Sequence, residues 1–147
     1  MAFYRGADIC ILCYDVTDPR SFNNLEIWYA DFLKQAQPVE PNTFPFVLVG
    51  NKIDLADQRL ISTQFASDWC LNKKNMSYFE TSVKEGLNVN EAFKDGTVRA
   101  LIREKQHKSM FDDIPNHIKI NNTENEHDSN HPIHLSKPIN YSLCNFC

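Results

Sequence analysis

The sequence contains no apolar run that approaches the roughly 18 consecutive residues needed to span a bilayer as a helix. Its first residues also lack the charged stretch, apolar core and cleavage site of a secretory signal, which favours a cytoplasmic setting and reduced cysteines. Clustered Lys and Arg are missing, and the formal net charge is -4. Because proteins that bind nucleic acid neutralise its phosphates with such clusters, we expect no nucleic-acid partner.

Metal-binding patterns are weak in this sequence. Two C-x-x-C pairs, Cys10/Cys13 and Cys144/Cys147, could form a zinc site, but they lie about 130 residues apart, far outside the spacing of a zinc ribbon. Cys10 and Cys13 also lie inside an apolar run, where free cysteine commonly packs as a small core residue, and we expect that role for both. The histidines are irregularly spaced in polar sequence, so we expect solvated side chains for His107, His117, His127, His131 and His134.

The composition changes near residue 106. Residues 1–106 alternate apolar runs with amphipathic segments, whereas residues 107–147 are rich in Asn, His, Asp, Pro and Ser. The first part predicts an α/β domain with a parallel sheet, whose strands at 8–14, 44–49 and 76–79 are each followed by a helix. The second part has few apolar residues to pack, so we expect a disordered tail.

Cap residues and apolar spacing locate the three helices. Ser21 is expected to cap the first helix, which carries one apolar stripe. The second helix is expected to begin near residue 63 and to be buried through Phe65 and Trp69. The third is expected to open with a capping box formed by Asn88 and Glu91.

The segment Asn51-Lys52-Ile53-Asp54 carries the strongest functional signal, because it leaves a buried strand at the edge where parallel sheets bind ligands. The Asp54 carboxylate can accept two parallel hydrogen bonds from the N1 and N2 donors of guanine. Adenine offers neither donor in that arrangement and would leave a charge unpaired, which gives discrimination of roughly 10³ or more. The Asn51 amide can bind the other edge of the purine, and the Lys52 stem can lie across the ring. The alternative is a polar turn without a ligand.

Residues 46–54 resemble the fourth guanine-contact motif of Ras-superfamily GTPases, and Glu80-Thr81-Ser82-Val83-Lys84 resembles the fifth, usually written ETSAK. The resemblance implies that Ser82 supports the loop, that the Val83 backbone N–H meets the guanine carbonyl oxygen, and that Lys84 flanks the base. Val83 stands where Ala is usual, which keeps the backbone donor but adds two methyl groups near the base. The alternative for this segment alone is an ordinary loop ahead of a helix.

Further segments resemble Rab proteins, and the late-endosomal and lysosomal Rab branch in particular. Residues 3–8 and 14–17 are similar to Rab proteins in general, whereas 35–46 and 110–115 are similar to that branch. The resemblance implies a P-loop NTPase (small GTPase) fold, GTP or GDP as ligand with magnesium in the full-length family, and Asp15 as a structural turn residue. It also implies Rab effectors and escort or GDI-type proteins as partners, and a role in vesicle-mediated transport at late endosomes and lysosomes.

The motifs of that family which bind phosphate are missing from the sequence. No G-x-x-x-x-G-K-[ST] occurs, and neither does a switch I segment, a D-x-x-G, or the Gln that orients the attacking water. The expectation is therefore an N-terminally truncated domain that lacks the P-loop and both switches and that does not hydrolyse GTP alone. A site for the base alone would bind in the millimolar range or weaker, about 4 kcal/mol.

The resemblance to this family also implies two weaknesses of the fold. The family's sheet has six strands, so the strand at 8–14 is expected to present an apolar, aggregation-prone edge. Gly96 lies in the last helix where the family usually has a large apolar residue. A glycine there is expected to cost helix propensity and to loosen the packing of the helix on the sheet.

The sequence ends in Cys144-Asn145-Phe146-Cys147, at the place where Rab proteins usually carry two prenylated cysteines. Two lipids anchor a protein stably, so the resemblance implies peripheral attachment to endosomal membranes through Cys144 and Cys147. The two-residue spacing departs from the usual arrangements and also reads as a C-a-a-X box with Asn at an aliphatic position. An unmodified tail is the alternative.

Three hypotheses for the function remain open at this point. The first is a Rab-type guanine-nucleotide switch, of which this chain is a fragment. The second is a truncated isoform that binds Rab partners without nucleotide; micromolar or tighter binding of labelled GDP would contradict it. The third is a decayed copy that does not fold, which a cooperative thermal transition would contradict.

Overall fold

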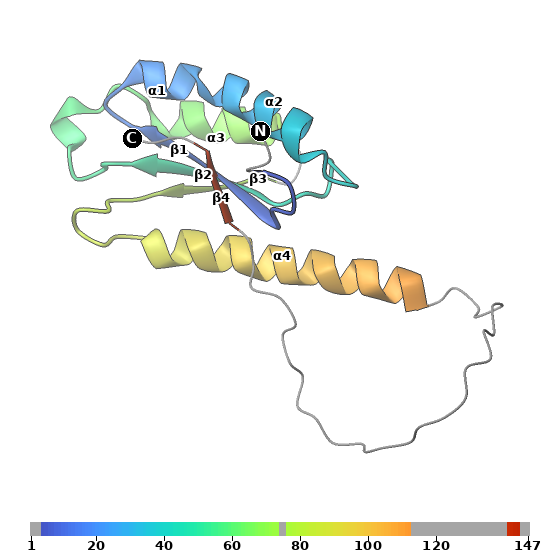
Figure 1. The fold of residues 1–147 in the computed structure, drawn as a ribbon. Helices are drawn as coiled ribbons and strands as arrows, with labels where there is room; N and C mark the ends of the chain where they lie inside the picture. The colour runs from blue at the N-terminus through green and yellow to red at the C-terminus, as the bar shows by residue number, and fades with distance from the viewer. Residues whose placement is uncertain (1–3, 74–75, 113–140, 145–147) are drawn as a thin grey trace, which may run out of the picture.

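The computed structural model describes the backbone of residues 4–73, 76–112 and 141–144. This part of the chain forms a parallel sheet with helices on both faces (Figure 1). The sheet has the order β3-β2-β1-β4 and consists of β1 (Ile9–Asp15), β2 (Phe46–Asn51), β3 (Met76–Glu80) and β4 (Tyr141–Cys144). The expected α/β class, with three parallel strands that alternate with helices, is confirmed.

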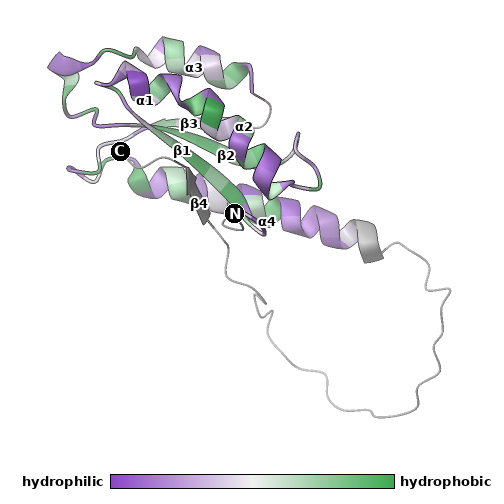
Figure 2. Ribbon diagram, turned by 45° about the horizontal axis from the view of Figure 1, so that its top comes forward, coloured by the Kyte–Doolittle hydropathy of each residue, from purple (hydrophilic) through white to green (hydrophobic). Residues whose placement is uncertain are grey.

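Three helices cover one face of the sheet and the longest helix covers the other (Figure 1). The first group consists of α1 (Pro19–Asn23), α2 (Leu25–Ala36) and α3 (Thr63–Leu71). The opposite face carries α4 (Val89–Asp112), and a short 3-10 helix, η1 (Ala56–Gln58), lies in the connection between β2 and α3. Figure 2 shows β1 and β2 as a hydrophobic layer between these helices.

Side chains of β1 alternate between two cores, as the two faces of a strand require. Cys10, Leu12 and Tyr14 pack in the core beneath α1, α2 and α3. Ile9 and Ile11 pack in the smaller core beneath α4, and Cys13 is packed against its edge. The expected core role is confirmed for Cys10, and Cys13 is partly buried against the second core; neither forms a disulfide within the described part of the chain.

The cap of α1 differs from the expectation. Asp18 is the N-cap residue, and its side chain accepts a 2.9 Å hydrogen bond from the backbone N–H of Arg20. Ser21 lies inside the helix, and its hydroxyl accepts from the backbone N–H of Asp15 at 2.9 Å. The prediction of Ser21 as the cap was wrong because Pro19, whose ring favours the first helical position, starts the helix earlier.

The buried face of α3 also differs from the expectation. The helix is capped by Ser62, whose hydroxyl accepts from the Phe65 backbone N–H at 3.2 Å. Its buried residues are Ala66 and Cys70, whereas the Phe65 side chain is 57% exposed. Burial through Phe65 was therefore a wrong prediction, and Trp69 is only partly buried at the edge of the core. Small residues at the centre of the contact let α3 lie close to the sheet.

The start of α4 is not the expected capping box. Asn88 has a positive φ of 54°, and its side-chain amide donates to the Glu80 carbonyl oxygen at 2.8 Å. An N-cap residue has extended backbone and uses its side chain on the helix itself. Asn88 instead ties the entry of α4 to the end of β3, and the capping box with Glu91 was a wrong prediction.

Gly96 is the point at which α4 lies against the sheet. It is buried, and a Cβ built there would overlap the Cδ1 atom of Ile9 and lie 3.2 Å from Cγ2 of Val47. The helix has approached the sheet until no room for a side chain is left. The expectation of loose packing at Gly96 was therefore wrong, because the missing side chain is compensated by a closer approach of the helix.

The region after residue 106 contributes more structure than expected. Helix α4 continues to Asp112, and β4 pairs in parallel with β1, with Ile9 opposite Tyr141 and Leu12 opposite Cys144. This strand covers the edge of β1 that was expected to be exposed, over four of its seven residues. The expected disorder of residues 113–140 and 145–147, and the expected lipidation of Cys147, concern positions outside the described residues.

Candidate functional site

The two predicted base-contact segments lie side by side at one edge of the sheet. Asn51–Asp54 leaves β2 and Thr81–Lys84 leaves β3, and the two strands are neighbours in the parallel sheet. Backbone hydrogen bonds join the segments: the Thr81 N–H donates to the Gly50 carbonyl oxygen at 2.8 Å, and the Ile53 N–H donates to the Thr81 carbonyl oxygen at 3.2 Å. The fold thus brings together residues that are about 30 positions apart, at the carboxyl ends of the strands.

Asn51 connects the two loops through its side chain. Its Oδ1 atom accepts a hydrogen bond from the Val83 backbone N–H at 3.2 Å and a longer one from the Thr81 hydroxyl at 3.4 Å. The Val83 N–H is the donor expected for the guanine carbonyl oxygen, and in this structure it is bound to Asn51. A base that approaches the site would share or replace this hydrogen bond.

Asp54 is held in place by the other loop. Its Oδ1 atom accepts from the Ser82 hydroxyl at 2.6 Å, and its side chain is only 7% exposed. The Lys84 ammonium lies 4.0 Å from Oδ2 and is itself largely exposed. A carboxylate has about four lone-pair positions, so the Ser82 bond leaves acceptor capacity for two parallel donors. Ser82 therefore orients Asp54, as expected for a residue that supports the loop.

Lys52 adopts a left-handed backbone, with φ of 69°, and reaches back to the end of β1. Its ammonium lies 2.6 Å from Oδ2 of Asp15, whose Oδ1 accepts from both the backbone N–H and the hydroxyl of Thr17. Burial raises the pKa of Asp15, but the hydrogen bonds from Lys52 and Thr17 outweigh it and hold this pKa below its usual value. Asp15 is thus the turn residue that the resemblance implied, and it fixes Lys52.

The second loop is closed by its own backbone. Ser82 and Leu87 exchange two hydrogen bonds, of 3.2 Å and 2.9 Å, across a turn in which Gly86 has φ of 70°. The Ser82 hydroxyl also accepts from the Glu85 N–H at 3.2 Å. This closure fixes the direction of the Ser82 side chain before any ligand is present. Val83, by contrast, is 66% exposed at the rim of the site.

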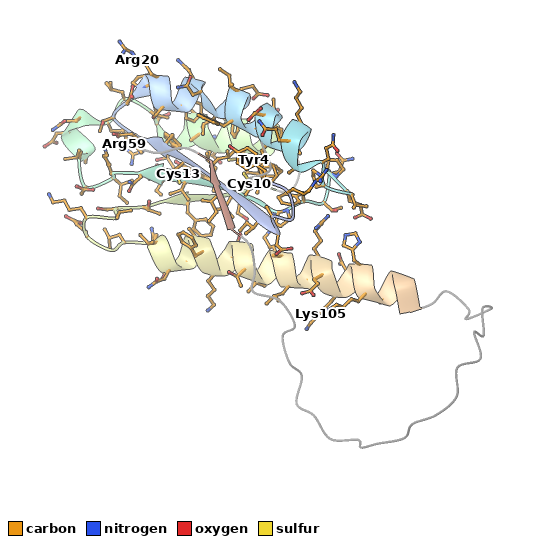
Figure 3. All side chains as sticks on the ribbon, viewed as in Figure 1. Tyr4, Cys10, Cys13, Arg20, Arg59 and Lys105 are labelled. Carbon is orange, nitrogen blue, oxygen red and sulfur yellow. The ribbon has the colours of Figure 1, made fainter. Side chains whose placement is uncertain are left out.

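A polar network that the sequence did not predict lies beneath the loops. Arg59 binds both carboxylate oxygens of Glu80, at 2.7 Å and 3.2 Å, and Thr63 and Tyr78 donate to the same carboxylate at 2.8 Å and 2.9 Å. Tyr78 is in turn 2.9 Å from the hydroxyl of Tyr14 in the core. Figure 3 labels Arg59 near this edge of the sheet.

This network and its burial shift the pKa values of Glu80 and Tyr14. Burial raises the pKa of Glu80, but the hydrogen bonds from Arg59, Thr63 and Tyr78 outweigh it, so the pKa lies below its usual value. Burial raises the pKa of Tyr14 to about 12. The charged Glu80 therefore anchors the start of the second loop from below. No sequence signal links Arg59 to Glu80, because the pair depends on how η1 and its exit cross the end of β3.

Gly50 is required by the same packing. A Cβ at this position would lie 2.6 Å from the Tyr14 hydroxyl oxygen and 2.9 Å from the ring carbon that carries it. The aromatic side chain of β1 crosses directly over the β2 backbone at the residue that precedes Asn51. The glycine before the first base-contact segment thus has a packing reason.

An apolar cavity of about 190 Å³ lies next to the site, between α4 and the sheet. Its lining includes Cys13, Val49, Val83 and Phe93 as well as Asn51.

In the described part of the chain, no group of three or more His, Cys, Asp and Glu could hold a metal ion. No described helix is long and apolar enough to cross a membrane.

Comparisons with known proteins agree with the fold. Residues 1–102 match the Ras family. The chain is 50% identical over 127 residues to "Ras-related protein RABG3a" of Arabidopsis thaliana, and the aligned residues cover 85% of this chain and 60% of that protein. It is 48% identical over 125 residues to "Ras-related protein Rab7" of Drosophila melanogaster (85% and 59%), and 48% identical over 120 residues to "Ras-related protein Rab-7a" of Dictyostelium discoideum (82% and 58%).

The parallel sheet and the two joined loops define a domain of the Ras-like small-GTPase class. The chain spans about 60% of the length of the relatives that it matches. It belongs to the Ras family, as a Rab protein of the Rab7 branch.

Proposed function

We propose that this chain recognises the guanine base of GTP or GDP, with Asp54 as the residue that selects guanine over adenine. The observation that carries the proposal is the hydrogen bond of 2.6 Å from Ser82 to Asp54, which holds a nearly buried carboxylate in one orientation at the ligand-binding edge. Leaving such a group without donors is costly, so a base without the N1 and N2 donors is rejected.

The other residues of the site have supporting roles in this proposal. Asn51 holds the two loops together and gives the Val83 N–H its position. Lys52 is fixed by Asp15 and offers its stem to the face of the ring. Lys84 is largely exposed beside Asp54, and in this proposal its stem lies over the other face. The side chain of Val83 sets the rim, where its methyl groups limit the space for the base.

The proposed biological role is that of a Rab7-like protein in endosomal vesicle traffic, with Rab effectors and escort or GDI-type proteins as partners. Its support is the family membership and the names of the relatives. Membrane attachment through lipids on Cys144 and Cys147 belongs to the same proposal. Because the backbone of Cys144 is paired with Leu12 of β1, we expect its modification to require that β4 leaves the sheet.

Binding of nucleoside monophosphates tests the recognition of the base. Guanosine and adenosine 5′-monophosphate carry the same phosphate, so any difference between them reports on the base. We expect guanosine monophosphate, at millimolar concentration, to shift the backbone amide NMR signals of Asn51, Val83 and Lys84, and adenosine monophosphate to leave them unchanged.

A pair of variants separates the proposed contact from a general effect of charge. Asp54→Ala is expected to abolish the response to guanosine monophosphate. Asp57→Ala removes a carboxylate from the exposed 3-10 helix η1 nearby and is expected to leave the response intact. Equal responses to the two nucleotides, or equal losses in the two variants, would overturn the proposal.

A further inference from the structure

A second candidate binding site lies at the opposite end of β2 from the base-contact loops. Here α4 and the segment before β2 line an open cavity of about 380 Å³. Its lining consists of Asn42, Thr43, Arg99, Ile102, Arg103 and Gln106. Two arginines and three uncharged polar side chains face this space, and its lining contains no acidic residue.

Among the lining residues, Arg103 gives the strongest indication that the cavity binds a ligand. Its guanidinium carbon lies 5.3 Å from the centre of the Phe44 ring, so packing and a cation–π contact hold it in place. Its Nε atom is buried and has no hydrogen-bond partner among the described residues. A buried donor without a partner is costly, and an anionic oxygen that enters the cavity would remove this cost after a small shift of the side chain.

The neighbouring charges have other partners. Arg99 lies 3.6 Å from Asp95 and donates to the Phe46 carbonyl oxygen at 3.0 Å. Of the nearby carboxylates, Glu104 lies 2.7 Å from Lys108.

Glu40 accepts from the Thr43 hydroxyl at 2.8 Å and lies 3.9 Å from His107. Within the described part of the chain, no ion pair joins any of these carboxylates to Arg103. The segment 99–108 also contains four Lys and Arg against one Glu, in a chain whose net charge is -4. Of these four basic residues, Arg99 and Arg103 line the cavity, whereas Lys105 and Lys108 do not.

We propose that this cavity binds a phosphorylated polyol, in which Arg103 holds the phosphate and Asn42 and Gln106 bind hydroxyl groups. The planar guanidinium suits the oxygens of a phosphate. The cavity is much larger than a phosphate needs, and its amide side chains match a ring that carries hydroxyl groups. The phosphorylated polyol is either the headgroup of a lipid or a free sugar phosphate. The proposal does not depend on recognition of guanine at the other end of the sheet.

Binding of inositol 1-phosphate to the full chain is the first measurement. NMR titration is expected to shift the backbone signals of Thr43, Arg103 and Gln106 and to leave those of Asn51 and Val83 unchanged. Inositol without phosphate and acetate are the controls, and neither is expected to bind. An absence of shifts with inositol 1-phosphate, or equal shifts with acetate, would overturn the proposal whatever the variants show.

Two variants of α4 remove the same charge at different places. Arg103→Gln is expected to weaken binding about tenfold or more, because it removes charge-assisted hydrogen bonds. Lys105→Gln is the matched control, since Lys105 is exposed and extends from the outer side of α4, away from the sheet (Figure 3). Equal losses in the two variants would mean general electrostatic attraction and would overturn the proposal.

A conservative variant covers the case in which Arg103→Gln does not fold. Arg103→Lys keeps the charge and much of the stem but loses the planar fork, so it is expected to fold and still to bind more weakly than the natural chain. Unchanged binding by Arg103→Lys would contradict recognition by the guanidinium.

Vesicle flotation separates the two sources of the ligand. Phosphatidylcholine vesicles that contain phosphatidylinositol 4-phosphate are compared with vesicles that contain phosphatidylserine at matched charge. Retention on the first alone supports a lipid headgroup, and binding of inositol 1-phosphate without retention supports a free sugar phosphate. Equal retention on both vesicle types, equally reduced by Arg103→Gln and Lys105→Gln, would overturn the site.

Discussion

Substitution of Gly96 tests how α4 is seated on the sheet. In an ordinary helix, Gly→Ala stabilises by up to about 1 kcal/mol. Here a Cβ would overlap Cδ1 of Ile9, which is fully buried, and would press on Val47 at 3.2 Å. Overpacking of this kind costs about 1–3 kcal/mol. We therefore expect Gly96→Ala to lower the free energy of unfolding by up to about 2 kcal/mol, the difference between these two effects.

A double-mutant cycle isolates the contact. Ile9→Val removes the Cδ1 atom that the new Cβ would meet, at a cost of about 0.5–1.5 kcal/mol by itself. In the double variant the overlap is gone, so Gly96→Ala is expected to cost about 1 kcal/mol less on the Ile9→Val background than alone. Urea unfolding followed by circular dichroism gives the four free energies.

A control on the same helix measures propensity without packing. Asn90 is exposed near the start of α4, so Asn90→Ala changes helix propensity and removes no buried contact. If Gly96→Ala stabilised the protein as much as Asn90→Ala, or if the two changes in the cycle were additive, α4 would not touch the sheet at Gly96. A cooperative transition in the natural chain would also contradict the hypothesis of a copy that does not fold.

Three further predictions follow from the described contacts. The pKa of Glu80 is lowered in the folded state. Its contribution to stability is therefore present above its unfolded pKa and is lost as the pH falls through the folded pKa. Glu80→Gln is expected to flatten the decline of the unfolding free energy in acid titrations. Deletion of residues 141–147 uncovers the edge of β1 and is expected to speed hydrogen exchange of its amides and to increase aggregation on light scattering. Ser82→Ala removes the hydroxyl that orients Asp54 and is expected to weaken guanosine monophosphate binding about threefold to tenfold by NMR titration, with thermal stability less affected.

Outcomes that contradict these three predictions are distinct. A Glu80→Gln variant with the natural acid profile would mean that the network around this carboxylate does not contribute to folding. Unchanged exchange at β1 after the deletion would mean that β4 does not protect this edge. Unchanged nucleotide binding by Ser82→Ala would mean that Asp54 is held by other contacts.

The layout of the sheet and the position of the candidate site were predictable from the sequence for a physical reason. β1 and β2 are buried on both faces, so their sequences are continuous apolar runs, and the polar residues that end them mark the ligand-binding edge. The hydrogen bond from Ser82 to Asp54 agrees with the loop-supporting role that the resemblance implied, whereas the Val83 N–H, which was expected to meet the guanine carbonyl oxygen, donates to Asn51 in this structure.

The features that were missed depend on how elements pack rather than on local pattern. Gly96 reads as a defect in a helix, and only the distance between α4 and Ile9 shows that no side chain fits. Phe65 has the right spacing for a buried face, but the small residues Ala66 and Cys70 occupy the contact. The short apolar segment of β4 is too brief to stand out in a polar tail, and it gains its conformation from the edge of β1.

Discrimination between two purines at Asp54 tests the central claim most directly. Xanthine has a carbonyl oxygen where guanine has the N2 donor, so it matches an amide side chain rather than a carboxylate. The natural chain is expected to bind guanosine monophosphate more tightly than xanthosine monophosphate, and Asp54→Asn is expected to reverse this order in NMR titrations. If both proteins ranked the two nucleotides in the same order, Asp54 would not read the base.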